Sequence, residues 1–354
     1  MKIHIRIPSL PGRALLCAGL IFNAAYAAEI IGAGSSAAAP LYKAWAEEWG
    51  HAAGSTLNYA PVGSGAGIKA IEAGKGEFGA SDVSLSKEEL EKFGLVNFPV
   101  AISGVVPVVN LPSVPQGELK LTGPVLAEIL GGTITQWNAP QIVALNHGMS
   151  LPDLPIVIVG RADGSGTTYV ISNYLGKVSE EWAKHFGNNL KIQWPASAQL
   201  ATGTSGMLKA VAAQPGAIGY AEWGQAEAAH LHIARVANQH GNYPAPDAAS
   251  FKAALENSSW STTGDFEEML TDTAGLNAWP ITGGTFIIMA RHVTDIKRAT
   301  MALSFFSYGF AKGDATAARQ GWIPLPERTQ VRVLREMSRL VDSQGLPLNW
   351  KMAY

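Results

Sequence analysis

Residues 156–168 read IVIVGRADGSGTT, and this stretch predicts an α/β protein. Ile156–Val159 is a continuous β-branched run, which is typical of a strand buried in a parallel sheet. The glycine-rich turn that follows leads into a helical pattern, in which Val170 and Tyr174 lie four residues apart on one face. A strand that passes through a short turn into a helix is the repeating unit of α/β folds.

The same succession of strand, turn and helix occurs twice nearer the N-terminus. Glu29–Ile31 predicts a strand before the turn at Gly32–Ser36, and Leu57–Tyr59 predicts another before the turn at Gly63–Gly67. Apolar residues recur every four positions after the first turn, as far as Trp49, which indicates an amphipathic helix. We therefore expect a mixed α/β protein.

Two further strands indicate how the chain is divided. Val105–Val109 predicts a strand that leaves a first lobe, and Phe286–Met289 predicts one that returns to it, so that two crossovers would form a hinge. Without residues 1–28 the chain keeps about 325 residues, more than one hydrophobic core usually serves, and two lobes are expected. Residues 226–262 have weak periodicity, and we expect them to lie at the periphery.

Residues 1–28 have the features of a cleavable secretory signal peptide. Basic residues precede an apolar run that is shorter than the roughly 20 residues of a membrane-spanning helix. Cys17 lies in this run and follows Leu16 instead of the small residue that lipid attachment needs. The mature chain would contain no cysteine, which excludes disulfides, thiolate metal sites and a cysteine nucleophile. Export without disulfides fits a bacterial periplasmic protein.

The charge of the chain argues against a nucleic-acid partner. The formal net charge is −2, and removal of residues 1–28 takes away three basic residues and no acidic one, which leaves −5. A protein that binds duplexes would have a clustered basic face instead. Any anion that this chain binds must therefore be held by local dipoles and hydrogen-bond donors.

The three glycine turns share features that suit an oxyanion. Glycine lets the backbone approach a ligand closely, and the first turn of a helix has unpartnered N–H groups at the positive end of the helix dipole. Such turns can bind oxyanions without net positive charge, and they carry the hydroxyls of Ser36, Ser64, Ser165 and Thr167. One such turn alone is commonly a helix cap, whereas three in one chain favour a ligand site.

Two charged residues narrow the class of ligand. Arg161 can hold two oxygens of a tetrahedral anion with its planar guanidinium, and Asp163 can orient it, although such a pair is also a common surface salt bridge. Asp82 is either a turn or helix-cap residue or, in the same cleft, the acceptor for a proton on the anion. Phosphate at neutral pH carries such a proton and sulfate does not. Sites that pair a ligand hydroxyl can reject analogues without it by about 10⁴-fold or more.

Short matches to enzyme motifs are incomplete. The turn at residues 32–37 is similar to a dinucleotide fingerprint but lacks an acidic residue at the usual distance. Ser84-x-x-Lys87 has the spacing of a penicillin-recognising serine nucleophile, without the partner motifs of that class. His230 and His232 are the best candidates for metal ligands, and they lack a nearby carboxylate cluster. We expect no catalytic residue, metal or cofactor, with an exported phosphatase or serine hydrolase as the alternative.

Seven segments, in the expected order, resemble those of the periplasmic phosphate-binding proteins, the PstS family of solute receptors for the high-affinity phosphate ABC transporter. They are GAGSSAAAPLYKAW, YAPVGSGAGIK, FGASDVSLS, FPVAISGVVPVVN, GRADGSGTT, PGAIGY and AWPITGGTFIIM. They extend over nearly the whole mature chain, and GASD together with RADGSGT is highly specific to this family.

This resemblance implies a type II periplasmic binding protein fold, with two lobes of mixed sheets joined by a two-crossover hinge. Residues 29–103 and 285–354 would form lobe I, and residues 104–284 would form lobe II. It also implies an exported, periplasmic monomer without a cofactor. Such a protein captures inorganic phosphate, as hydrogen phosphate, and delivers it to the membrane permease of an ABC transporter. A receptor for another oxyanion, such as sulfate, is the nearest alternative.

The resemblance also implies which residues contact phosphate. The first two turns would supply Ser36, the amide of Ala37, and Ser64; Asp82 would accept the phosphate proton; the other lobe would supply Arg161, Ser165, Gly166 and Thr167, with Asp163 orienting the arginine.

Three positions depart from the family pattern. Ser36 stands where threonine is frequent, Ala37 where phenylalanine is frequent, and Gly160 where an arginine is common. The first change keeps the hydroxyl, the second removes a hydrophobic wall, and the third removes a positive charge. We expect these departures to change affinity more than the identity of the ligand.

Overall fold

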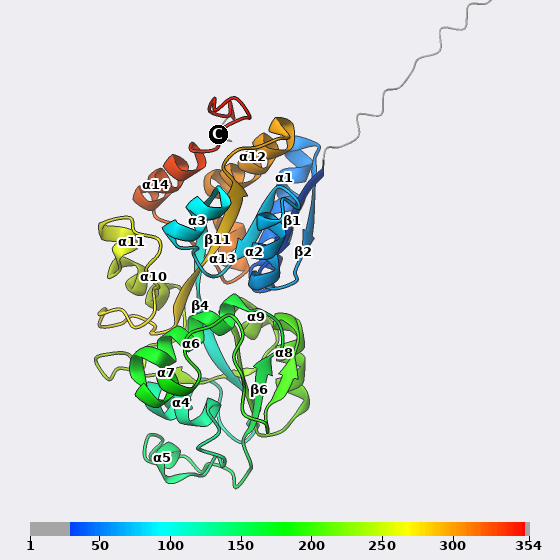
Figure 1. Ribbon diagram of the computed structural model, residues 1–354. Helices are drawn as coiled ribbons and strands as arrows, with labels where there is room; N and C mark the ends of the chain where they lie inside the picture. The colour runs from blue at the N-terminus through cyan, green and yellow to red at the C-terminus, as the bar shows by residue number, and fades with distance from the viewer. Residues whose placement is uncertain (1–28, 351–354) are drawn as a thin grey trace, which may run out of the picture.

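The structure, a computed structural model, describes residues 29–350, and the signal peptide expected at residues 1–28 lies outside them. Figure 1 shows the helices and strands in two groups, one above the other, with β4 (Leu95–Val109) and β11 (Thr282–Ala290) running between them. The mixed α/β class predicted from the sequence is therefore confirmed. Within residues 29–350, no helix combines the length and the apolar character that crossing a membrane requires.

The upper group in Figure 1, here the β1 group, consists of two separate parts of the chain. Its elements are β1 (Glu29–Gly34), α1 (Ala39–Ala53), β2 (Thr56–Ala60), α2 (Ser64–Glu72), β3 (Phe78–Ser81), α3 (Lys87–Phe93), α12 (Ile296–Lys312), α13 (Asp314–Arg319), β12 (Ile323–Pro324) and α14 (Glu327–Met337).

The lower group, here the β6 group, is formed by the middle of the chain. Its elements are β5 (Lys120–Leu121), α4 (Gly123–Leu130), α5 (Pro140–Val143), β6 (Val157–Arg161), α6 (Gly166–Val178), α7 (Glu180–His185), β7 (Gln199–Ala201), α8 (Gly203–Ala213), β8 (Ala217–Glu222), α9 (Trp223–Ala228), β9 (His232–Ile233) and β10 (Arg235–Val236). Two more helices, α10 (Ala248–Glu256) and α11 (Ser259–Thr262), pack beside β4, β11 and α14.

Strand β4 is shared by the two groups. Its first part, Leu95–Gly104, is antiparallel to β11, and its last part, Val105–Val109, is antiparallel to β8. The strand order is β2-β1-β3-β11-β4-β8-β6-β7, and β9 and β12 also pair with β4. All 15 residues of β4 are buried, as its nearly continuous apolar sequence predicts. The strands expected at Val105–Val109 and Phe286–Met289 are thus confirmed as parts of β4 and β11.

The parallel strands lead into the helices that the sequence predicts. Strand β1 is parallel to β2 and β3, and β6 is parallel to β7 and β8. Helix α1 buries Leu41, Tyr42, Trp45 and Trp49, and helix α6 buries Val170, Ile171, Tyr174 and Leu175. Each helix packs its apolar face against the core, so that its N-terminus and the preceding turn lie at the carboxyl end of a strand.

The expectation that residues 226–262 lie at the periphery is wrong. Phe251 of α10 and Trp260 of α11 are buried in the core. The Phe251 ring packs on Gly104 of β4, where a Cβ atom would lie 2.2 Å from the ring, and the Trp260 ring packs in the same way on Gly284 of β11. Helices α10 and α11 have only 9 and 4 residues, which is too short for a long apolar stripe. Each helix is anchored in the core by one large buried ring instead.

Candidate functional site

The three glycine turns meet where the two groups face each other. The Gly63 N–H donates to the Gly34 carbonyl at 2.8 Å, which ties the first two turns together. The Gly65 N–H donates to the Gly164 carbonyl at 2.9 Å, which joins the β1 group to the β6 group. A Cβ atom on Gly65 would lie 3.3 Å from the Cα atom of Gly164. Glycine at these positions therefore allows the two backbones to approach closely.

The N-terminus of α6 lies against Ser64 and Asp82. The Asp82 N–H donates to Ser64 Oγ at 3.2 Å, so these two residues of the β1 group are in contact. A Cβ atom on Gly166, the first residue of α6, would lie 2.5 Å from Ser64 Oγ and 2.8 Å from Asp82 Oδ2. The helix N-terminus therefore faces a buried carboxylate, which it can approach only because Gly166 has no side chain.

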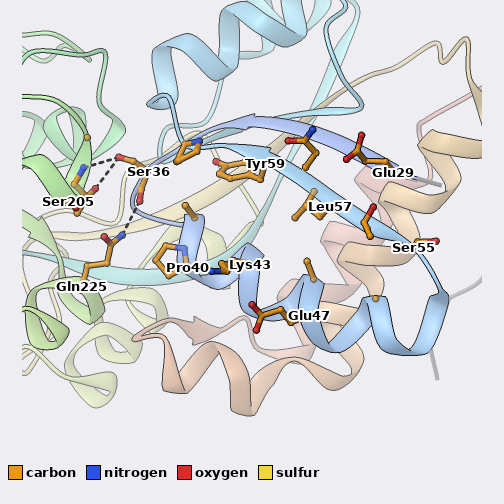
Figure 2. Close-up of a pocket in the computed structure, with 18 of the residues that line it drawn as sticks. Glu29, Ser36, Pro40, Lys43, Glu47, Ser55, Leu57, Tyr59, Ser205 and Gln225 are labelled. Atoms are coloured by element: carbon orange, nitrogen blue, oxygen red, sulfur yellow. Dashed lines mark hydrogen bonds between the residues drawn. The ribbon is translucent and has the colours of Figure 1, made fainter. Parts of the chain in front are cut away.

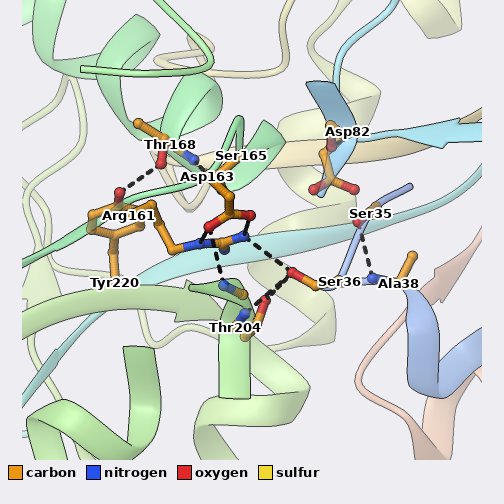
Figure 3. Close-up of polar contacts among 12 residues, drawn as sticks. Ser35, Ser36, Ala38, Asp82, Arg161, Asp163, Ser165, Thr168, Thr204 and Tyr220 are labelled. Atoms are coloured by element: carbon orange, nitrogen blue, oxygen red, sulfur yellow. Dashed lines mark hydrogen bonds and ion pairs between the residues drawn. The ribbon is translucent and has the colours of Figure 1, made fainter. Parts of the chain in front are cut away.

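Asp82 is a buried carboxylate with one unpartnered oxygen. The residue is 6% exposed, and its Oδ1 atom has no hydrogen-bond partner. Burial raises the pKa of Asp82 to about 6, against the opposing effects of hydrogen bonds with Ser35, Thr285 and Thr167 and of the Arg161 charge. Figure 3 shows the Asp82 carboxylate directed toward the turn that carries Ser35 and Ser36. An oxygen of this kind can accept a hydrogen bond from a ligand.

Arg161 lies across the same turn and is paired with Asp163. Arg161 Nε donates to Asp163 Oδ1 at 2.7 Å, and Nη2 donates to Asp163 Oδ2 and, at 3.2 Å, to Ser36 Oγ. The Arg161 and Asp163 side chains are 2% and 14% exposed, so the pair is not a surface salt bridge. Burial opposes ionisation of Asp163, but the hydrogen bonds and charge of Arg161 dominate and lower its pKa. Figure 3 shows the guanidinium between Asp163 and Ser36.

The other expected site residues lie around the same closed region. Ser165 caps α6, because its Oγ atom accepts a hydrogen bond from the Thr168 N–H at 3.1 Å. Ala37, Asp82 and Thr167 line a cavity of about 20 Å³, together with Glu222 and Trp322. The structure therefore brings together all the residues that the sequence singled out for the ligand. The Ser165 oxygen accepts the cap hydrogen bond, which leaves its O–H group to donate to a ligand.

Sequence reasoning missed three polar residues of the β6 group. The Thr204 N–H donates to Ser36 Oγ at 3.2 Å, and Gln225 Nε2 donates to the carbonyls of Ser36 and Ala37 at 3.0 and 2.7 Å. Glu222 is buried and accepts hydrogen bonds from Ser103 Oγ and from the N–H groups of Gly224 and Gln225. Burial, the largest effect, raises the pKa of Glu222 to about 8.

A signal for Thr204 was present in the sequence. Residues 202–206 read TGTSG and lead from β7 into α8, which is the same succession as in the other three turns. Gln225 had no such signal, because it lies in the short helix α9 and reaches the first turn only through the tertiary fold.

A groove of about 1320 Å³ runs from this site along α1 and β2. Its far end is at Glu29, and its inner end is lined by Ser36, Thr204 and Gln225. Figure 2 shows Ser36 and Gln225 at one end of the groove and Glu29 at the other. Thr204 and Gln225, which donate hydrogen bonds to the first turn, therefore lie between the buried site and the groove.

Ser84 and Lys87 line one pocket, but each side chain has a different partner. Ser84 Oγ accepts a hydrogen bond from Asn97 Nδ2 at 2.8 Å, while Lys87 Nζ lies 3.8 Å from Glu267. Among residues 29–350, no group of three or more histidine, cysteine, aspartate or glutamate residues is placed to hold a metal ion.

Comparisons with known proteins agree on one family. The family described as PBP superfamily domain matches residues 23–312. The phosphate-binding protein PstS of Xylella fastidiosa (strain Temecula1) is 42% identical over 298 residues, which cover 84% of this chain and 82% of that protein. The PstS protein of Pasteurella multocida is 37% identical over 322 residues, which cover 91% and 93%.

A solved structure has the same fold. The high affinity periplasmic phosphate-binding protein PfluDING, bound with phosphate, aligns with a TM-score of 0.68 and 23% identity over 87% of this chain and 93% of that chain. At this level of identity the similarity establishes the fold alone.

Proposed function

This chain belongs to the PstS family of phosphate-binding proteins within the PBP superfamily, and we propose that it captures inorganic phosphate between the β1 group and the β6 group. The relationship expected from its motifs is confirmed. It is the solute-binding protein of an ABC transporter, and its relatives are named for binding and not for catalysis. We expect it to act as a monomer, without enzymatic activity, and to deliver phosphate to the transporter's membrane permease.

The observation that carries this proposal is the unpartnered Oδ1 atom of Asp82. A buried carboxylate in an anion site is repulsive unless the anion brings a proton, and hydrogen phosphate does. Its O–H group would donate to Asp82, which satisfies an acceptor that otherwise costs free energy. Sulfate has no proton to donate and would place its charge directly against that of Asp82. The burial of Asp82 therefore supports a preference for phosphate over sulfate.

The remaining oxygens of phosphate would be held by donors from both groups. Arg161 uses Nε and Nη2 for Asp163 and Ser36, so its Nη1 atom can face a phosphate oxygen while Asp163 fixes the guanidinium plane. Ser36, Ala37 and Ser64 would contribute from the β1 group. Ser165, Gly166 and Thr167 would contribute from the start of α6, where the helix dipole favours an anion.

Capture would follow from closure about β4 and β11. We expect lobe I to comprise residues 29–103 and 285–354 and lobe II to comprise residues 104–284, so that both crossovers act as the hinge. Phosphate would bind the closed arrangement more tightly than the open one and shift the population toward it. The N-terminal residues 1–28 would direct export to the periplasm and be removed there.

Titration calorimetry of the protein comprising residues 29–354 tests this function. We expect phosphate to bind with a dissociation constant in the micromolar range or below, which corresponds to a binding free energy of about −8 kcal/mol or stronger. Arsenate, which is also protonated, should compete, and sulfate should bind far more weakly. Sulfate binding as tight as that of phosphate would overturn the proposal.

A further inference from the structure

The first turn is held by Gln225 and Thr204, which are not among the expected ligand residues. Gln225 Nε2 donates to the carbonyls of Ser36 and Ala37, and the Thr204 N–H donates to Ser36 Oγ. Thr204 Oγ1 also lies 3.1 Å from Ser36 Oγ. All of these hydrogen bonds join the β6 group to the β1 group. They therefore form when the two groups are together and are lost when the groups separate.

The Gln225 amide has only one orientation that fits. Both of its partners are backbone carbonyl oxygens, which accept hydrogen bonds and cannot donate them. The two N–H groups of Nε2 therefore serve the two carbonyls. An oxygen in place of Nε2 would face two acceptors and repel both.

These two hydrogen bonds also fix the direction of a backbone N–H group. In a trans peptide unit the carbonyl and the N–H of the next residue point in opposite directions. Since the Ser36 carbonyl is bonded to Gln225, the Ala37 N–H is directed away from Gln225. The Ala37 amide is one of the proposed phosphate donors, so Gln225 orients a ligand contact without touching the ligand.

Hydrogen bonds through Glu222 connect the backbone of Gln225 to strand β4. Glu222 accepts hydrogen bonds from the N–H groups of Gly224 and Gln225 at 2.7 and 3.1 Å, which fixes the start of α9. Ser103 Oγ in β4 donates to Glu222 at 2.6 Å. One chain of hydrogen bonds therefore runs from β4, through Glu222 and the backbone of Gln225, to the first turn.

We propose that Gln225 and Thr204 form a latch that positions the Ser36–Ala37 peptide and slows the release of bound phosphate. This inference rests on the proposed function. The latch residues line the inner end of the groove along α1, so their separation from Ser36 would open a path from the site to solvent. Gln225 and Thr204 act as positioning residues, and they change the lifetime of the closed state and not the choice of ligand.

Four variants test the latch. Gln225→Glu keeps the shape of the side chain and replaces the donor by an acceptor, and Gln214→Glu makes the same change at an exposed position of the β6 group as a control. Thr204→Val removes the hydroxyl at nearly constant volume, and Thr204→Ser restores it. Release and binding of inorganic phosphate are measured by stopped-flow tryptophan fluorescence, together with the unfolding temperature of each ligand-free protein.

The latch predicts that the variants change the rate constant for phosphate release and leave the association rate constant unchanged. Two lost hydrogen bonds should speed phosphate release about tenfold or more in Gln225→Glu, and one lost bond should speed it about threefold to tenfold in Thr204→Val. Thr204→Ser should recover most of the slow release, and Gln214→Glu should behave as the unchanged protein. Association rates, the phosphate-over-sulfate ratio and ligand-free unfolding temperatures should stay the same. Unchanged release in both Gln225→Glu and Thr204→Val, or an equal loss of stability without ligand, overturns the latch.

Different results would overturn the latch and the proposed function. A wild-type protein that binds neither phosphate nor arsenate overturns the function. Hydrogen exchange at the Thr204 amide still reports on the latch in that case, because this N–H is bonded to Ser36 Oγ. Exchange should be faster in Ser36→Ala and in Gln225→Glu than in wild type, and equal exchange rates in all three overturn the latch.

Discussion

Replacing Asp82 by asparagine removes the charge and keeps the size of the side chain at the centre of the proposed site. Asp82 is 6% exposed, and its Oδ1 atom has no partner within the protein, so a protonated ligand would be its hydrogen-bond donor. In Asp82→Asn the side chain becomes neutral and can turn its NH₂ group toward a ligand oxygen. We therefore expect phosphate to bind more weakly and sulfate to bind more tightly.

The magnitude follows from the burial of this contact. A hydrogen bond to a charged group contributes about 1.5–3 kcal/mol, or about 10- to 150-fold in the dissociation constant of phosphate. Sulfate gains affinity in the variant because its repulsion by the buried carboxylate is removed. The phosphate-over-sulfate ratio should therefore fall by about 10²-fold or more.

Titration calorimetry at a pH of about 8 measures this ratio, because Asp82, whose pKa is about 6, is ionised there in the free protein. Glu222→Gln is the matched control, since it replaces another buried carboxyl group of the same cavity, about half ionised at this pH, whose oxygens are hydrogen-bonded to the protein. The control should change the binding of both anions alike and leave the ratio unchanged. An unchanged ratio in Asp82→Asn, or an equal fall in the control, would refute the role of Asp82.

Four other predictions follow from the same contacts. Arg161→Ala should weaken the binding of phosphate at least tenfold in calorimetry, because one charged contact is lost. Gly166→Ala should also weaken it at least tenfold, because the added Cβ would meet Ser64 and Asp82. If the two groups are apart without phosphate, as we propose, the unfolding temperature of the ligand-free protein should not change. The preference for phosphate over sulfate should narrow as the pH falls through about 6, because a neutral Asp82 carboxyl can donate to a sulfate oxygen. Burial raises the pKa of Glu222 from 4.5 to about 8, so between these values the folded protein binds more protons than the unfolded chain and stability falls as pH rises. Glu222→Gln should remove this dependence, at most about 1.4 kcal/mol per pH unit, in urea unfolding measured across that range.

The parts of the fold that could be predicted are those with local signals. The turns at Gly32–Ser36, Gly63–Gly67 and Gly164–Thr168 each join a strand to a helix, so each could be located from its own neighbourhood. The turn at Thr204 uses the same residue types but was missed. It follows β7, which has only 3 residues, two of them exposed, and therefore no apolar run to mark it.

The contacts between the two groups could not be predicted in this way. Gln225 and Ser36 are 189 residues apart, and a glutamine in a short helix has no pattern that identifies its partner. Phe251 and Trp260 are buried because glycines in β4 and β11 leave room for their rings, which depends on tertiary packing and not on periodicity. The proposed ligand residues come from the family motifs, which carry information from related proteins that the single sequence does not express as a pattern.

The pairing of β4 with β11 has a consequence for how the chain acquires its structure. Leu95 pairs with Ala290 and Gly104 with Thr282, so the central strand of the sheet cannot complete its hydrogen bonds until most of the polypeptide is present. Contacts between residues so distant in sequence slow folding, because a long loop must close before they form. A polypeptide that folds slowly remains unfolded for longer. We expect residues 1–28 to direct this chain across a membrane, and slow folding would keep it able to cross for longer.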